Sequence, residues 1–179
     1  ARSGSTLVFP TNVLGKEYIS LNFTQIPNQG RSQITVVATD VSPEALQIAK
    51  LNAKHLHSKN VEFALGNWFE AIQDHAHKMF DIIVSNPPYV ANFDPHLTQG
   101  DLRFEPDRAL VSGIEGMDAI SLITQQAEKY LHDGGMLMVE HGYNQALAVQ
   151  EIFRNAGLAS IVTLQDYAGV DRITLGQKI

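Results

Sequence analysis

From about residue 33, apolar runs rich in β-branched residues alternate with segments of helical length, and this alternation constrains the fold more than any other feature. Residues 34–40, Ile-Thr-Val-Val-Ala-Thr-Asp, have the composition of a buried strand that ends on an acid. Ser42 then predicts a helix cap, Pro43 suits the first turn, and the helix is expected to reach about His57. The pattern indicates an α/β fold with a mostly parallel sheet and crossover helices.

The remaining expected elements continue the same alternation. Strands are predicted at 61–65, 80–85 and 135–140, helices at 68–74, 116–131 and 144–156, and a long loop at 91–112. Two closing strands, 160–164 and 171–175, lie one turn apart, so an antiparallel hairpin at the sheet edge is expected. Residues 5–9 and 18–23 could form strands without a convincing helix between them. We therefore divide the chain into an atypical segment, 1–32, and an α/β domain, 33–179.

Composition excludes several classes of protein. With 179 residues, 44% of them hydrophobic, the chain can bury one core. A formal charge of -6 argues against nucleic acid held by phosphate contacts. The absence of cysteine excludes disulfides and thiolate chemistry, and the paired histidines at 55/57 and 75/77 have a spacing that argues against a metal site. No apolar run is long enough to cross a membrane, so a soluble, unexported protein of the cytoplasm or an organellar matrix is expected.

The clearest functional motif is Asn86-Pro87-Pro88-Tyr89, which follows the apolar run 80–84. The Asn86 side-chain carbonyl and the backbone carbonyl of Pro87, in a turn that Pro88 stiffens, offer two acceptors for one NH2 group. Tyr89 can lie flat against the amide or base that carries this group. The motif indicates a site for a planar nitrogen; the structural alternative is a turn that only ends the strand.

Asp40 at one strand end and the Asn-Pro-Pro-Tyr motif at another resemble the class I S-adenosylmethionine-dependent methyltransferases that act on nitrogen. Together with Asn67-Trp68-Phe69, Gly100–Pro106 and Glu140-His141-Gly142, residues 33–179 resemble the HemK-type enzymes, the peptide chain release factor N5-glutamine methyltransferases. The resemblance implies a Rossmann-like class I methyltransferase fold. It makes 33–179 the catalytic domain.

The resemblance also implies a role for each motif residue. Asn86 and the Pro87 carbonyl would orient the glutamine amide nitrogen of a Gly-Gly-Gln motif and stabilise its developing charge, with Pro88 and Tyr89 completing the substrate site. Asp40 would accept the ribose hydroxyls of S-adenosylmethionine, and Asn86 would also border the cofactor. Trp68 would either flank the adenine or pack in the core.

Outside the motif, alternatives stay open. Arg103 and Glu105 would line the glutamine site, or would pair with each other or with the ends of the long loop. No chemical step is assigned to Glu140 and His141.

One expected part of such an enzyme is missing from the sequence. The acidic, glycine-rich cofactor turn belongs about 20 to 25 residues before Asp40, where the chain has a single glycine, Gly15. The chain also lacks the amino-terminal helical domain with which these enzymes engage the release factor. Because the turn is missing, a catalytically silent domain of the same fold remains an alternative. A second alternative follows from the Asn-Pro-Pro-Tyr motif: an adenine N6 DNA methyltransferase, whose substrate amine poses the same chemical problem.

Overall fold

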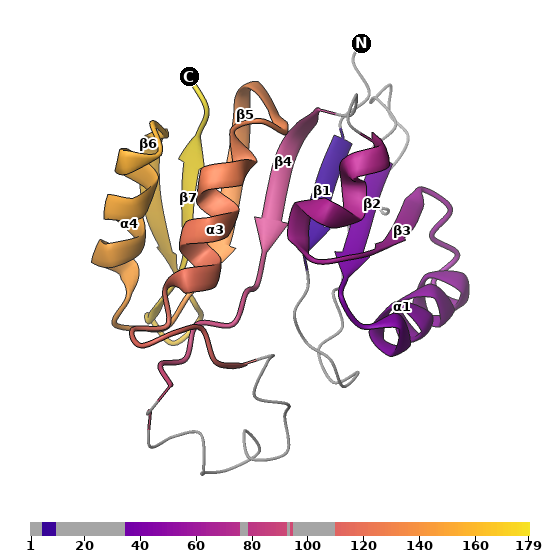
Figure 1. Cartoon of the computed structure of the whole chain (residues 1–179), viewed down its shortest axis with the longest axis horizontal. Helices are drawn as coiled ribbons and strands as arrows, with labels where there is room; N and C mark the ends of the chain where they lie inside the picture. Colours follow the sequence, from indigo (N-terminus) through magenta and orange to yellow (C-terminus); the bar gives the residue numbers. More distant parts are fainter. Residues whose placement is uncertain (1–4, 10–34, 76–78, 93, 95–109) are drawn as a thin grey trace.

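One seven-stranded sheet organises the chain, in the order β3-β2-β1-β4-β5-β7-β6 (Figure 1). The computed structural model describes residues 5–9, 35–75, 79–92, 94 and 110–179. The strands are β1 (Ser5–Phe9), β2 (Thr35–Asp40), β3 (Val61–Leu65), β4 (Phe80–Ser85), β5 (Leu131–Glu140), β6 (Ala159–Gln165) and β7 (Asp171–Gln177). Strands β1 to β5 pair in parallel, and β7 pairs antiparallel with both β5 and β6. The predicted α/β fold with an antiparallel C-terminal hairpin is confirmed.

The strand predicted at residues 5–9 is β1, and it occupies the centre of the sheet. It pairs with β2 on one side and with β4 on the other. The second early strand considered, 18–23, and the expected place of the cofactor turn lie outside the described residues.

Helices connect the parallel strands. They are α1 (Pro43–His55), the 3₁₀ helix η2 (Trp68–His75), α3 (Asp118–Ala127) and α4 (Ala146–Asn155). Figure 1 shows η2, α3 and α4 side by side on one face of the sheet, in agreement with the contacts of α3 with both of the others. Because crossovers are right-handed, the connection from β2 out to β3 places α1 on the opposite face. In the described ranges, no helix is both long enough and apolar enough to cross a bilayer.

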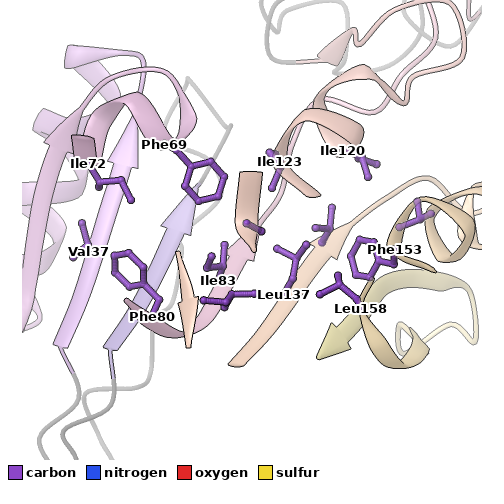
Figure 2. Close-up of a cluster of buried hydrophobic side chains, with 14 residues drawn as sticks. Val37, Phe69, Ile72, Phe80, Ile83, Ile120, Ile123, Leu137, Phe153 and Leu158 are labelled. Carbon is purple, nitrogen blue, oxygen red and sulfur yellow. The ribbon is translucent and has the colours of Figure 1, made fainter. Parts of the chain in front are cut away.

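The main core lies between the sheet and the row of η2, α3 and α4. Figure 2 shows its side chains, which come from strands and helices far apart in the sequence. Those fully shielded from solvent include Ile72, Phe80, Ile83, Ile120, Ile123, Leu137 and Phe153. Burial of such a side chain stabilises the fold by about 1.5–3 kcal/mol.

The predicted helix at 116–131 is too long. It ends at Ala127, and strand β5 already begins at Leu131, four residues before the predicted start at 135. Leu131 is fully buried and pairs with Phe80 on β4. The chain leaves the helix early because this leucine is needed in the sheet, a tertiary contact that local periodicity does not reveal.

The predicted long loop at 91–112 is described only at its two ends. Val90 and Val111 form an isolated parallel bridge, in which the Val90 N–H donates to Leu110 O (2.8 Å) and the Ser112 N–H to Val90 O (3.0 Å). The bridge holds the chain leaving the Asn-Pro-Pro-Tyr turn against the chain entering α3.

Candidate functional site

The carboxyl ends of the five parallel strands share one edge of the sheet, called here the carboxyl edge. Strand order reverses direction between β1 and β4, because the chain goes from β1 through β2 to β3 and then returns to β4 and β5. In open α/β sheets, ligands bind beyond the carboxyl ends of the strands at such a reversal. The Asn-Pro-Pro-Tyr turn, residues 86–89, directly follows β4 at this point.

Asp40 and Asn86 lie at the same level of the sheet on either side of β1. Val8 pairs with Ala38 and Phe9 with Ser85, so each of the two polar residues is one position past the level of Phe9. Strands separated by one intervening strand are about 10 Å apart. The structure thus brings together the two residues that the sequence marked for cofactor and substrate.

Asp40 is held by hydrogen bonds to both its side chain and its backbone. Its side chain is buried, with 6% exposure, and Oδ1 accepts the backbone N–H of Ser42 (2.8 Å). The Ser42 hydroxyl in turn caps α1 by accepting the N–H of Ala45 (3.1 Å), as predicted. Gly66 at the end of β3 donates its N–H to the Asp40 carbonyl (3.0 Å). The carboxylate is therefore fixed at the carboxyl edge by its immediate neighbours.

Trp68 follows β3, the strand next to β2, and so lies near the same edge as Asp40. Its backbone has a φ of +47°, a left-handed conformation that is uncommon for a bulky residue. The ring is half-buried and packs against the core cluster. Of the two roles expected for Trp68, packing in the core is thus observed.

In the turn itself, Pro87 and Pro88 are buried and Asn86 is half-buried. No hydrogen bond to the Asn86 side chain or to the Pro87 carbonyl is found among the residues that the structure describes. Within that part of the chain, the two acceptors singled out from the sequence remain available to a ligand.

Tyr89 is fixed at both ends of the residue. Its hydroxyl donates to Glu140 Oε1 at the end of β5 (3.3 Å), and its backbone carbonyl accepts a hydrogen bond from the Gln145 side chain (2.9 Å). The aromatic ring is half-buried against the core cluster. Sequence reasoning assigned Glu140 no chemical step, and the structure gives it a contact with the motif tyrosine.

His141, next to Glu140, is completely buried and binds within the fold. Its Nε2 lies 2.9 Å from Thr174 Oγ1 on β7, and its Nδ1 lies 2.9 Å from the Gly142 carbonyl oxygen. The histidine therefore ties β5 to the C-terminal hairpin.

Sequence reasoning missed Gln145 and misread Gly116, which it took as the start of a helix. Both lie against the Tyr89 carbonyl. Two further residues named from the sequence, Arg103 and Glu105, lie outside the described residues. Within the described part of the chain, no group of three or more His, Asp or Glu side chains could hold a metal ion.

Known methyltransferases are similar to this chain in sequence and in fold. The family described as a methyltransferase domain matches residues 15–169. The chain is 48% identical over 147 residues to the release factor glutamine methyltransferase of Xylella fastidiosa (strain 9a5c), covering 82% of this chain and 52% of that protein. It is 46% identical over 147 residues to the enzyme of the same name from Yersinia pestis, with the same coverage. The chain thus spans about half the length of the curated relatives it matches.

Among solved structures, a methyltransferase from Pyrococcus furiosus matches with a TM-score of 0.69 and 20% identity, over 99% of this chain and 76% of that one. At this identity the likeness concerns the fold alone. The sequence matches confirm the resemblance to release factor glutamine methyltransferases. From its strand order and from a family match over most of its length, we conclude that the chain belongs to the methyltransferase domain family.

Proposed function

We propose that the chain is the catalytic part of an S-adenosylmethionine-dependent enzyme that methylates the side-chain amide nitrogen of the glutamine in the Gly-Gly-Gln motif of peptide chain release factors. The observation that carries the proposal is the common level of Asp40 and Asn86 on the two sides of β1, at the reversal of strand order. The names of the relatives at 46–48% identity support the class of substrate.

On the substrate side, the residues of the Asn-Pro-Pro-Tyr turn would bind and orient the amide. An amide nitrogen is a weak nucleophile because its lone pair is delocalised into the carbonyl, so alignment matters more than a strong base. Asn86 Oδ1 and the Pro87 carbonyl would accept its two N–H bonds and stabilise the positive charge that develops during transfer. Tyr89 would hold the plane of the amide, with Pro88 stiffening the turn.

On the cofactor side, the side chains at the carboxyl edge are suited to bind a nucleoside. The Asp40 carboxylate, oriented by the Ser42 N–H, is suited to accept the ribose hydroxyls, and Trp68 would lie beside the adenine. Asn86 would border the cofactor as well as the substrate. S-adenosylmethionine, when bound, supplies an electrophilic methyl group on a sulfonium centre.

The division of the chain made from its sequence is part of the proposal. Residues 33–179 would form the catalytic domain around the central strand β1, which the atypical segment 1–32 contributes, and this segment would stand in place of the usual glycine-rich cofactor turn. The partner would be a release factor rather than a nucleic acid, in keeping with the formal charge of -6. Such a substrate would place the reaction in the cytoplasm or an organellar matrix.

The test is methyl transfer to a release factor, read by mass spectrometry on the Gly-Gly-Gln glutamine. We expect the chain to add one methyl group and Asn86→Ala to abolish most of the transfer. Asn155→Ala is the matched control, because Asn155 is exposed at the end of α4 away from the carboxyl edge. Undiminished transfer by Asn86→Ala would exclude the role given to Asn86.

Two additional measurements separate the alternatives. Calorimetric titration with S-adenosylmethionine distinguishes an enzyme from a silent domain, since a silent domain would give no saturable heat at millimolar ligand. Methylation of an adenine-containing DNA duplex in place of the release factor would favour the DNA methyltransferase instead.

A further inference from the structure

The side chain of Gln145 connects three separate segments at the carboxyl edge. Its Nε2 donates to the backbone carbonyl of Tyr89 (2.9 Å) and to that of Glu115 (3.2 Å). Its Oε1 accepts the backbone N–H of Gly142 (2.8 Å). One half-buried amide thus joins the Asn-Pro-Pro-Tyr turn, the turn before α3 and the turn between β5 and α4.

The partners fix the orientation of this amide. Carbonyl oxygens can only accept, so the NH2 group must face Tyr89 and Glu115, and a backbone N–H can only donate, so the oxygen must face Gly142. Both N–H bonds and one lone pair of the oxygen are used. No other natural side chain of this length offers two donors and an acceptor in a plane.

Gly116 shows how closely these groups are packed. It is buried, and its φ of +76° is the left-handed conformation that glycine adopts readily. A Cβ added at Gly116 would collide with the Tyr89 carbonyl oxygen and lie 2.9 Å from Gln145 Nε2. The absence of a side chain at Gly116 therefore leaves room for the Gln145 amide beside the Tyr89 carbonyl.

The need for such an anchor follows from the turn it holds. Pro87 and Pro88 have no N–H groups, so the turn cannot be fixed by donating its own backbone hydrogens there. The residue after the turn, Val90, donates its backbone N–H to the Leu110 carbonyl. The Tyr89 carbonyl, in contrast, accepts a hydrogen bond from the side chain of Gln145, 56 residues away in sequence. A change at Gln145 would reach the Asn86 and Pro87 acceptors through this carbonyl.

We infer that Gln145 is a positioning residue for methyl transfer: its amide holds the Asn-Pro-Pro-Tyr turn so that the acceptors at Asn86 and Pro87 face the substrate nitrogen. The inference rests on the proposed function for its catalytic part. Its structural part, the anchoring of the turn, is measurable without activity.

Gln145→Ala is the first test, with kcat and cofactor affinity measured separately. Loss of the anchor should lower kcat by about tenfold or more, since small misplacements of reacting groups are costly. The affinity for S-adenosylmethionine should change much less, because the Asp40 carboxylate is oriented by the Ser42 N–H. Gln177→Ala is the matched control. Its amide also donates to a distant backbone carbonyl, that of Gly134 (2.9 Å), but at the opposite edge of the sheet.

Gln145→Glu separates positioning from stability. The carboxylate can still accept the Gly142 N–H, and a negative charge before α4 favours the helix. It cannot donate to the two carbonyls. We expect this variant to recover part of the stability lost in Gln145→Ala and yet to have a kcat as low as that of Gln145→Ala. Recovery of kcat together with stability in Gln145→Glu would mean a purely structural role.

Gly116→Ala approaches the same carbonyl from the other side. Gly157→Ala is its matched control, because Gly157 has a similar φ of +79° and a Cβ added there would have no atom within 4 Å. Both variants carry the same backbone cost, so the difference between them isolates the contact with Tyr89 and Gln145. We expect a loss of kcat in Gly116→Ala alone.

Hydrogen exchange decides the inference even if the wild-type chain transfers no methyl group. The protection of the Val90 and Gly142 amide protons, measured by NMR, should fall in Gln145→Ala and stay unchanged in Gln177→Ala. A wild-type chain without activity but with this pattern would overturn the proposed function and leave the anchor supported. Unchanged protection, or a kcat in Gln145→Ala equal to that of the wild-type chain, would overturn the inference.

Discussion

The two halves of the candidate site are held in different ways. Asp40 is oriented by the N–H of Ser42, two residues along the chain. Tyr89 is held by Glu140 and Gln145, 51 and 56 residues away. The orientation of the Asp40 carboxylate on the proposed cofactor side therefore depends on a neighbour at the start of the following helix. The proposed substrate side depends on the correct packing of β4 against β5 and α4, and so on the fold as a whole.

The largest expected effect tests whether the two halves serve two ligands. Asn86→Ala should lower kcat by about 10²–10³, the usual cost of removing one group that stabilises transition-state charge, with a much smaller change in cofactor affinity. Asp40→Ala should instead weaken S-adenosylmethionine binding by about 10- to 100-fold, because hydrogen bonds to a carboxylate are lost. Steady-state kinetics and calorimetric titration measure the two effects. If both variants changed both quantities equally, the division of roles would be wrong.

This difference also explains what could be read from the sequence. Asp40 and the cap at Ser42 were predicted because the strand end, the cap and the first helical turn follow one another within a few residues, where strand and helix patterns apply. Asn86 and Tyr89 were predicted because their order in the motif is itself unusual. Gln145 was not, because two of its three partners are 30 and 56 residues distant and nothing in its neighbourhood marks it.

The arrangement of the strands likewise depends on contacts between residues that are distant in sequence. The alternation of strands and helices predicted most elements. The central place of β1, however, follows from its pairing with residues that lie 30 positions later in β2 and 76 positions later in β4. No local pattern states which strands will be neighbours. Similarly, the early start of β5 follows from the pairing of Leu131 with Phe80, which is a tertiary contact.

A second prediction concerns a series of hydrogen bonds that begins at His141, next to Glu140 on the substrate side. The Gly142 carbonyl can only accept, so His141 carries its proton on Nδ1 and its Nε2 accepts the Thr174 hydroxyl. Thr174 also contacts the Thr163 hydroxyl (2.8 Å), which accepts from Gln150 (2.9 Å). Long-range hydrogen bonds thus continue from the carboxyl edge into α4 and the hairpin.

Thr174→Val keeps the shape of this fully buried side chain but leaves His141 Nε2 without its donor. The expected loss of stability is about 1–3 kcal/mol, the cost of an unsatisfied buried group. Denaturant-induced unfolding measures it. Thr124→Val is the matched control, because that buried hydroxyl donates to Ile120 O within α3, a carbonyl also bonded by the helix, and its loss should cost less than about 1 kcal/mol. Equal losses of stability in Thr174→Val and Thr124→Val would show that the hydrogen bonds through His141 add nothing to stability beyond burial.

A third prediction concerns the local side. Ser42→Ala removes the side-chain cap of α1 and should cost about 1 kcal/mol of stability. It keeps the backbone N–H that Asp40 accepts, so the affinity for S-adenosylmethionine should be unchanged. Thermal unfolding and calorimetric titration check the two parts. A large loss of cofactor affinity would show that α1 must be intact to position Asp40, and the local description of this side would fail.

The smallest expected effect lies in a third region, the turn between β6 and β7. The Val170 N–H is the main cause that lowers the pKa of Asp166 below its usual range. Desolvation, the second-largest effect, opposes it, and the Arg172 side chain and the Ala168 N–H lower the pKa further. Because the folded-state pKa is depressed, the stabilisation is present above the unfolded-state pKa of about 4. It is lost as pH falls through the folded-state value.

Asp166→Asn should remove this pH dependence. The wild-type chain should be more stable than the variant at neutral pH, and the two unfolding curves should converge as pH falls below about 4. Because Asp166 is exposed and far along the sheet from β1 and β4, kcat at neutral pH should not change. Local bonds that lie far along the sheet from β1 and β4 would then affect stability alone, whereas those at Asp40 affect binding. A constant gap between the two curves across this range of pH would mean that the turn is held by its backbone and not by the Asp166 charge.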